Sequence, residues 1–317
     1  MLEVFRPLRF ARLPIVVLAG ALWTGPATGQ NQGQGGAAPQ PVERLPNSTV
    51  APAGQPGAPF QLNAQQQQLV DQVLDQWEAE SAKVRTFTCP FERLEYDPVF
   101  MKNGQKIPVT KSQGLLRYAR PDKGLFKITE VRRYDPKTGD WKKSDEPDEH
   151  WVCDGTAVYE FDAVKKQMIV RLLPPEYQGK AIADGPLPFL FNAEARKLKQ
   201  RYFIRVTRAT DTEIWLDVYP RRQHDAANYR RVEMILDRHR FLPSAVQVFL
   251  PNNKNRVVYV FRPDHAKVND TIERLLGVFK PPRTPIGWKK VIERIPAAPP
   301  RAQAARPPRE PGPAARR

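Results

Sequence analysis

The stretch Gly114-Leu-Leu-Arg-Tyr-Ala-Arg-Pro121 predicts a β-strand around which the fold is organised. Leu116, Tyr118 and Arg120 share one face of this strand, because side chains alternate along a strand. The glycine marks the start of the strand, and the proline ends it because proline has no N–H to donate. Arg120 is the anomaly, since a guanidinium on an apolar face needs acceptors or water. The alternative is an arginine that reaches solvent from the strand end.

Short strand-like segments extend from this stretch in both directions. Thr86–Tyr96 places Phe87, Cys89 and Phe91 on one face and then shifts phase, as at a bulge. Spacings of about 8–12 residues with hairpin turns favour a meandering antiparallel sheet. The other expected strands are 124–134, 151–153, 156–162, 167–173, 202–210, 213–219, 229–237, 242–250 and 256–261.

Residues 64–84 predict an amphipathic helix that needs a surface to lie on. Asn63 is its expected N-cap. Shorter helices are expected at 192–200, with Asn192 as the cap, and at 269–279. The apolar residues that recur at three- and four-residue steps in the first helix are Leu69, Val70, Val73, Leu74 and Trp77.

Several strands are apolar on both faces, such as 213–219 and 256–261. An open sheet with one wet face shows a cleaner alternation. The pattern therefore predicts one large curved sheet with two covered faces, and one of these faces could be a partly filled hollow.

The N-terminus predicts a signal peptide at residues 1–29. Arg6, Arg9 and Arg12 precede a short apolar run, and a small-x-small cleavage site follows before Gln30. The run is short for a spanning helix, which needs about 20 residues. We therefore expect export to the periplasm or cell envelope with cleavage near Gly29/Gln30, and an uncleaved anchor is the alternative.

The rest of the chain divides by composition into three parts. Residues 30–62 are rich in Gln, Gly, Ala and Pro and predict a disordered tether. Residues 63–280 form one folded domain. Residues 281–317 predict a basic, Pro-rich disordered tail with nine Lys or Arg against two Glu, a net +7 within a chain of +16. Such a tail can be drawn to an anionic membrane surface, although a solubilising tail without a partner is the simpler interpretation.

No recognised catalytic motif occurs in the sequence, which favours a protein that is not an enzyme and uses no cofactor. His150 follows a run of Asp and Glu from 145 to 149, but the run has no spacing that would aim metal ligands, so no metal is expected. A hydrolase built on Glu149 and His150 is a weak alternative. Cys89 and Cys153 could form a disulfide in an oxidising compartment, or remain two separate buried thiols.

The order of these motifs resembles the bacterial periplasmic outer-membrane lipoprotein carrier (LolA-like) family over roughly residues 65–263. The tether, the basic tail and a long charged loop at 136–148 depart from the family pattern. The motifs that carry the resemblance are Phe87 and Phe91, Gly114-Leu-Leu-Arg-Tyr-Ala-Arg-Pro121, Asp154-Gly-Thr-Ala-Val-Tyr-Glu-Phe-Asp162, Pro186-Leu-Pro-Phe-Leu-Phe191 and Phe241-Leu-Pro243.

The resemblance implies an α+β fold, mainly β. Its strongly curved antiparallel sheet forms an incomplete barrel, with helices as a lid over the concave face. The family's lid-latch arginine falls on Arg120, where it would hydrogen-bond the lid backbone. The residues expected to line the ligand-binding cavity are Phe87, Phe91, Leu116, Tyr118, Phe126, Tyr159 and Phe161.

These observations predict an exported, monomeric, non-enzymatic binder or carrier of a lipid or of the acyl chain of a lipidated protein. The alternative is a cell-envelope regulatory or scaffold protein that uses the same fold to recognise a protein. Export argues against nucleic acid as the working ligand. Kinship of fold does not by itself identify the cargo.

Overall fold

The computed structural model describes residues 57–98, 107–145, 149–175, 178, 193–252, 254–271 and 277–294. Its elements in chain order are α1 (Ala64–Lys83), β1 (Thr86–Tyr96), β2 (Thr110–Ala119), β3 (Lys123–Tyr134), β4 (Trp141–Lys143), β5 (His150–Cys153), β6 (Ala157–Asp162), β7 (Gln167–Leu172), α2 (Ala195–Arg201), β8 (Tyr202–Ala209), β9 (Glu213–Pro220), α3 (Gln223–Ala226), β10 (Arg231–Asp237), β11 (Pro243–Phe249), β12 (Arg256–Phe261), the 3₁₀ turn η4 (Pro263–His265), β13 (Lys267–Val268) and β14 (Lys289–Arg294).

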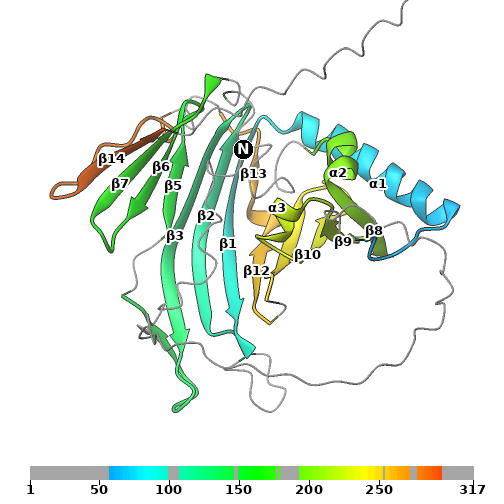
Figure 1. The fold of residues 1–317 in the computed structure, drawn as a ribbon, viewed down its shortest axis with the longest axis horizontal. Coiled ribbons are helices and arrows are strands. Elements are labelled where there is room, and N and C mark those ends of the chain that lie inside the picture. The colour runs from blue at the N-terminus through cyan, green and yellow to red at the C-terminus, as the bar shows by residue number, and fades with distance from the viewer. Residues whose placement is uncertain are drawn as a thin grey trace, which may run out of the picture.

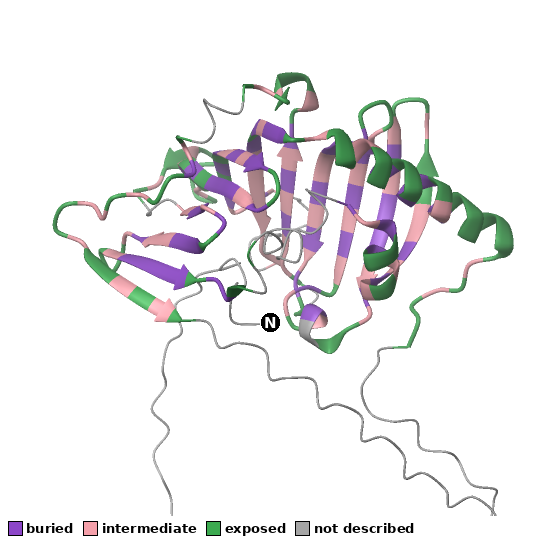
Figure 2. Ribbon diagram, turned by 90° about the horizontal axis from the view of Figure 1, so that it is seen from above, coloured by how far each residue is buried: buried purple, intermediate pink, exposed green. Residues whose placement is uncertain are grey.

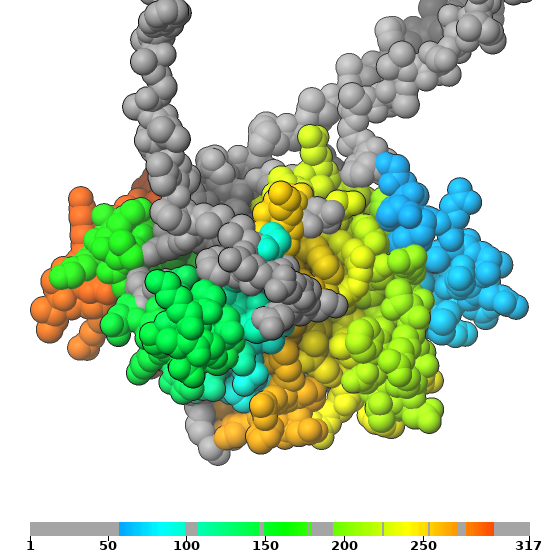
Figure 3. Space-filling model, turned by 90° about the horizontal axis from the view of Figure 1, so that it is seen from below, coloured from blue at the N-terminus to red at the C-terminus, as the bar shows by residue number. Residues whose placement is uncertain are grey.

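The fourteen strands of the described residues belong to one open, curled sheet, in agreement with the expected α+β fold (Figure 1). Its order is β14-β7-β6-β5-β3-β2-β1-β12-β11-β10-β9-β8, with β4 beside β3 and β13 beside β1. The pairs are antiparallel except β14 with β7, which is parallel. Helix α1 packs beside β8. In the space-filling view, α1 and strand β14 lie at opposite ends of the molecule (Figure 3).

The two faces of the sheet are covered over different stretches. The inner face is defined here as the face that carries Phe87, Phe91 and Phe126, and its buried residues form one cluster that runs from β6 to β8 and includes α1. The opposite, outer face has a second buried cluster at the β3–β7 end. Phe279, from the segment that leads to β14, belongs to this second cluster. Figure 2 shows the resulting alternation of buried and partly exposed bands along the strands.

Helix α1 begins with the expected cap. The Asn63 side chain accepts a hydrogen bond from the Gln66 N–H at 2.8 Å, and the Gln66 side chain accepts one from the Asn63 N–H at 3.0 Å. This reciprocal arrangement satisfies two donors that a helix start leaves open. The apolar stripe then packs beside β8, with Leu69 left outside it at 39% exposure. Its buried members are Val70, Val73, Leu74 and Trp77.

The structure corrects several expected boundaries. Strand β2 begins at Thr110, so Gly114 lies inside the strand. Helix α2 begins at Ala195 with Glu194 as its N-cap, while Asn192 lies outside the described residues. The helix expected at 269–279 is not helical at 269–271 or 277–279, and its middle lies outside the described residues.

The expected tether and tail both contribute to the fold. Phe60 packs edge-on against Tyr219, with ring centroids 5.8 Å apart, and Leu62 packs against the main core. Lys289–Arg294 forms β14, because Glu293 can reach the buried Arg171 at 2.9 Å while the backbone pairs with β7. The signal peptide, most of the tether and residues 295–317 lie outside the described residues. Within the described part of the chain, no helix has the length and apolarity to cross a membrane.

Candidate functional site

An aromatic cluster occupies the middle of the inner face. The Phe91 and Phe126 rings stack at 4.8 Å, and Trp151 stacks on Phe126 at 5.9 Å. Tyr259 and Phe261 lie 6.0 and 6.1 Å from Phe91. These distances are within the range of favourable ring contacts. The five residues are called the inner aromatic cluster below.

Five of the seven predicted cavity residues lie together on this face. The register pairs Phe87 with Tyr118 and Leu116 with Phe126 on neighbouring strands, and Phe91 lies two residues beyond Cys89 on the same face. All five are only 1–3% exposed. An acyl chain could therefore reach them only if the parts of the protein that cover them move.

Tyr159 and Phe161 do not join this set. Tyr159 pairs with Val152, which pairs with Leu125, whereas Phe126 pairs with Trp151 on the other face. Because side chains alternate along strands, Tyr159 and Phe161 project from the outer face. There Phe161 stacks on His150 with ring centroids 4.4 Å apart. The resemblance placed the motif but did not determine which face it lines.

The end of α1 is held by two side chains from distant parts of the chain. The Arg120 guanidinium donates to the Ala82 carbonyl at 2.9 Å. The Asn269 amide donates to the Lys83 carbonyl at 3.0 Å and accepts from the Arg85 N–H at 2.7 Å. The last carbonyls of a helix lack partners within the helix, and a cation is favoured beside them. Arg120 and Asn269 are called the helix clamp below.

Sequence reasoning missed Asn269 as part of this clamp. Its φ is +56°, in the left-handed region that asparagine tolerates better than most residues. The sequence pattern predicts a helix start at this residue, and no local pattern connects it with residue 83. The role of Arg120 as a lid latch remains a proposal, and the hydrogen bond to α1 is the observation on which that proposal rests.

Beyond Phe91, strand β1 keeps its phase, and the side chains that it places on the inner face become charged. The β1 register runs without a break, so Arg93 and Glu95 follow Phe91 on the same face. The Arg93 guanidinium lies 2.6 Å from a Glu149 carboxylate oxygen and 3.2 Å from Glu95. Thr110 donates to Glu95 at 2.7 Å. The expected bulge near Leu94 is therefore wrong.

Glu149 and His150 point to opposite faces and do not form an acid–base pair. Glu149 faces Arg93 on the inner face, and burial raises the pKa of its carboxyl. His150 lies on the outer face, where burial, assisted by the charge of Lys127, lowers its pKa to about 4. No group of three or more His, Cys, Asp or Glu that could hold a metal occurs among the described residues. The hydrolase alternative thus has no geometric support from Glu149 and His150.

Cys89 and Cys153 are free, buried thiols. Strands β2 and β3 separate β1 from β5, so the two cysteines are three strand spacings, or about 14 Å, apart. A disulfide needs Cα atoms within about 7 Å. Burial raises the pKa of Cys153 to about 12, which keeps this thiol protonated and unreactive. The disulfide alternative is therefore wrong.

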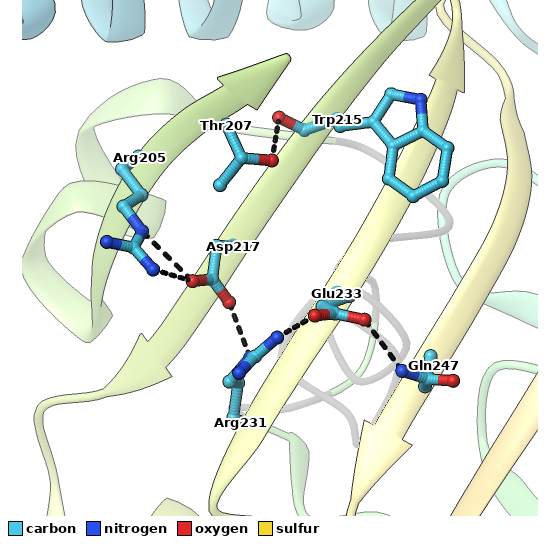
Figure 4. Close-up of polar contacts among 7 residues, drawn as sticks. All are labelled: Arg205, Thr207, Trp215, Asp217, Arg231, Glu233 and Gln247. Atoms are coloured by element: carbon cyan, nitrogen blue, oxygen red, sulfur yellow. Dashed lines mark hydrogen bonds and ion pairs between the residues drawn. The ribbon is translucent and has the colours of Figure 1, made fainter.

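The outer face of β8–β11 carries a polar network of a different kind (Figure 4). Asp217 is 2% exposed and lies between the guanidinium groups of Arg205 at 2.6 Å and Arg231 at 2.7 Å. Arg231 also contacts Glu233, which accepts a hydrogen bond from Gln247 at 2.6 Å. Each charge here lies beside an opposite charge, as in a self-contained structural network.

No protein-family model and no curated protein matches the chain at a significant level. Among solved structures, an uncharacterised conserved protein from Thermus thermophilus is 9% identical with a TM-score of 0.35, covering 70% of this chain and 98% of its own. A LolA superfamily protein from Nitrosomonas europaea is 10% identical with a TM-score of 0.29, covering 64% and 96%. MucB in its complex with MucA from Pseudomonas aeruginosa is 13% identical with a TM-score of 0.32, covering 65% of this chain and 60% of its own. Likenesses at this level neither place the chain in a family nor support a function.

Proposed function

We propose that the protein is an exported, non-enzymatic carrier or binder that holds an acyl chain of a lipid or lipidated protein against its inner face beneath α1. The observation that carries this proposal is the large apolar cluster of the inner face, which includes the buried stripe of α1, together with the helix clamp at the end of that helix. The sequence motifs that resemble the lipoprotein carriers point to the same use of the face.

The magnitudes are compatible with a lid that opens. An acyl chain gains roughly 0.8 kcal/mol for each CH₂ group that it buries. Each clamp hydrogen bond contributes about 0.5–3 kcal/mol, with the charged donor toward the upper end. The binding of a long chain can therefore offset the loss of both bonds. If the acyl chain occupies the position of the apolar stripe of α1, its contacts with the inner face can also replace those of the helix.

The proposal is tested by identifying what the protein carries. Protein purified from its own host without detergent is denatured, extracted with organic solvent and analysed by mass spectrometry, with the folded protein then titrated with the apolar dye N-phenylnaphthylamine. We expect an extracted acyl compound, and saturable dye binding once that compound has been removed. A folded protein that yields no amphiphile and binds no dye would rule the proposal out.

A second candidate is a cell-envelope regulatory or scaffold protein, favoured by arginines stacked on half-buried rings of the outer face. Arg231 lies 4.7 Å from the Phe249 ring centroid, and Arg256 lies 4.1 Å from that of Tyr96. Arginine and aromatic residues are enriched where proteins bind one another. If this face recognises a protein, Arg256→Ala should abolish a cross-linked complex in intact cells and leave the lipid content unchanged. Retention of the complex would contradict it.

A further inference from the structure

The charged end of the inner face is a cluster of polar groups inside an apolar surface. In the sheet register, Arg93 lies between Ser112 of β2 and Tyr259 of β12, and all three side chains share the inner face. Glu95 and Glu149 complete the group. These five residues are called the inner polar cluster below.

Four atoms of this cluster lack a hydrogen-bond partner among the described residues. They are the hydroxyl oxygens of Ser112 and Tyr259, one carboxylate oxygen of Glu149 and the Nε of Arg93. Only the Arg93 Nε has an ion-pair contact, 3.2 Å from Glu95. Ser112 and Tyr259 are each only 2% exposed. A buried polar group without a partner costs about 1–3 kcal/mol, so unpartnered groups in a native interior require an explanation. The Asp217 network on the outer face also has two atoms without a hydrogen bond, but these atoms, Asp217 Oδ1 and Arg231 Nε, lie 2.7 Å from each other in an ion pair.

The charges of the cluster disfavour a charged ligand of either sign. One guanidinium lies between two carboxylates, so an anion meets Glu95 and Glu149 while a cation meets Arg93. Burial also raises the pKa of Tyr259, which keeps its hydroxyl protonated as a neutral donor and acceptor. Two hydroxyls and a carboxylate oxygen can donate to and accept from hydroxyl groups of a ligand.

The cluster adjoins the apolar part of the face, and Tyr259 contacts both parts. The Tyr259 ring lies 6.0 Å from Phe91 and 6.4 Å from Phe126, whereas Arg93 is its cross-strand neighbour. The side chains of Glu95 and Glu149 remain 30% and 26% exposed, so the cluster also reaches solvent. An amphiphile with its chain against the rings would thus place its head beside these polar groups.

We propose that the inner polar cluster is the recognition site for the head of the amphiphile, and that it selects an uncharged, hydroxyl-bearing head such as a glycerol ester. This inference rests on the proposed function, because the chain must occupy the inner face for the head to reach the cluster. Ser112, Tyr259 and Glu149 hydrogen-bond the head, and Arg93 holds Glu149 in position.

The experiment compares ligands of equal chain length on the full-length mature protein. Monodecanoylglycerol, decanoate and decylamine are titrated against bound N-phenylnaphthylamine, which has no comparable head. We expect monodecanoylglycerol to displace the dye at a concentration about tenfold lower than either charged ligand. Tyr259→Phe and Ser112→Ala should each weaken this ligand about five- to tenfold, the effect of one lost hydrogen bond, and leave dye affinity unchanged. Tyr159→Phe, which removes a tyrosine hydroxyl from the outer face, is the matched control.

The outcomes separate the two proposals. Dye binding without preference for the uncharged head, or with a preference for decanoate or decylamine, overturns the recognition site and leaves the carrier function standing. The recognition site is likewise overturned if Tyr159→Phe weakens monodecanoylglycerol as much as Tyr259→Phe does. Absence of binding by the dye and by every amphiphile overturns both proposals.

Discussion

Gly114 shows how one residue allows the inner aromatic cluster to form. A Cβ at this position would lie 2.4 Å from the Phe91 Cζ and 2.7 Å from the Lys127 carbonyl oxygen. The β2–β3 register also shifts at this point, between Gln113 and Gly114. A glycine inside a strand often marks close approach of another group, and here that group is the Phe91 ring.

We therefore expect Gly114→Ala to destabilise the protein by about 1–3 kcal/mol, the usual cost of overpacking a core. The free energy of unfolding is measured by urea denaturation. Gly57→Ala is the control, because nothing lies within 4 Å of a Cβ at that position. Equal stability of the two variants would show that the ring does not need the space.

The lowered pKa of His150 predicts that the stability of the protein depends on pH. Its folded pKa is about 4, while an unfolded histidine titrates near 6.5. Since the unfolded chain takes up the proton first, stability should fall as the pH drops from about 6.5 to about 4. His150→Phe, which keeps a ring against Phe161, should flatten this part of the profile. An unchanged slope in His150→Phe, or an equal change in the exposed control His239→Phe, would contradict the assignment.

At the scale of elements, the proposed lid role of α1 makes the helix clamp a control on how readily a ligand reaches the inner face. Arg120→Ala removes a charged donor from the Ala82 carbonyl, and Asn269→Ala frees the Lys83 carbonyl. We expect each variant to speed the entry of N-phenylnaphthylamine in stopped-flow fluorescence and to lower stability by about 1–2 kcal/mol. Arg132→Ala removes an exposed arginine paired with Glu130 and should leave the entry rate unchanged. Unchanged entry in both clamp variants would show that α1 is not a lid.

Strand β14 completes one edge of the sheet. A chain ended after Trp288 loses the parallel pairing with β7 and the contact of Glu293 with Arg171, whereas a chain ended after Arg294 keeps both. We expect only the shorter chain to lose about 5 °C in Tm, a shift typical of roughly 2 kcal/mol in a domain of this size. Its exposed β7 edge should also promote self-association, measurable by light scattering. Equal Tm and equal size of the two chains would contradict a structural role for β14.

Local patterns are sufficient to predict most of the elements but not their long-range partners. Thr86–Tyr96 is a strand with the predicted bounds, and α1 begins after the predicted cap. Alternation alone cannot show which face of β6 is the inner one, so the prediction places Tyr159 and Phe161 on the wrong side. The polar cluster has a visible sequence signal, because Arg93 and Glu95 continue the face of Phe91. The sequence analysis predicts a phase shift there instead, because charged residues are expected to avoid an apolar face.

At the scale of the whole molecule, the basic end of the chain consists of a part that belongs to the sheet and a part beyond it. Residues 281–294 contain β14 and its approach, and only 295–317 lie beyond the described structure. A test of membrane attraction should therefore remove 295–317 alone, because a longer deletion also removes a strand. The two edges of the sheet differ: α1 packs beside β8 at one edge, and β14 pairs with β7 at the other.

An acyl chain that lies against the inner face must come within reach of the side chains of β1, β2 and β3. Photo-cross-linking with a diazirine-labelled fatty acyl glycerol, followed by peptide mass spectrometry, tests it most directly. We expect labelled peptides from β1, β2 and β3 that contain Phe91, Leu116 or Phe126, with labelling that unlabelled monodecanoylglycerol suppresses. Labelling confined to the outer-face peptide with Tyr159 and Phe161, or labelling that no competitor suppresses, would contradict it.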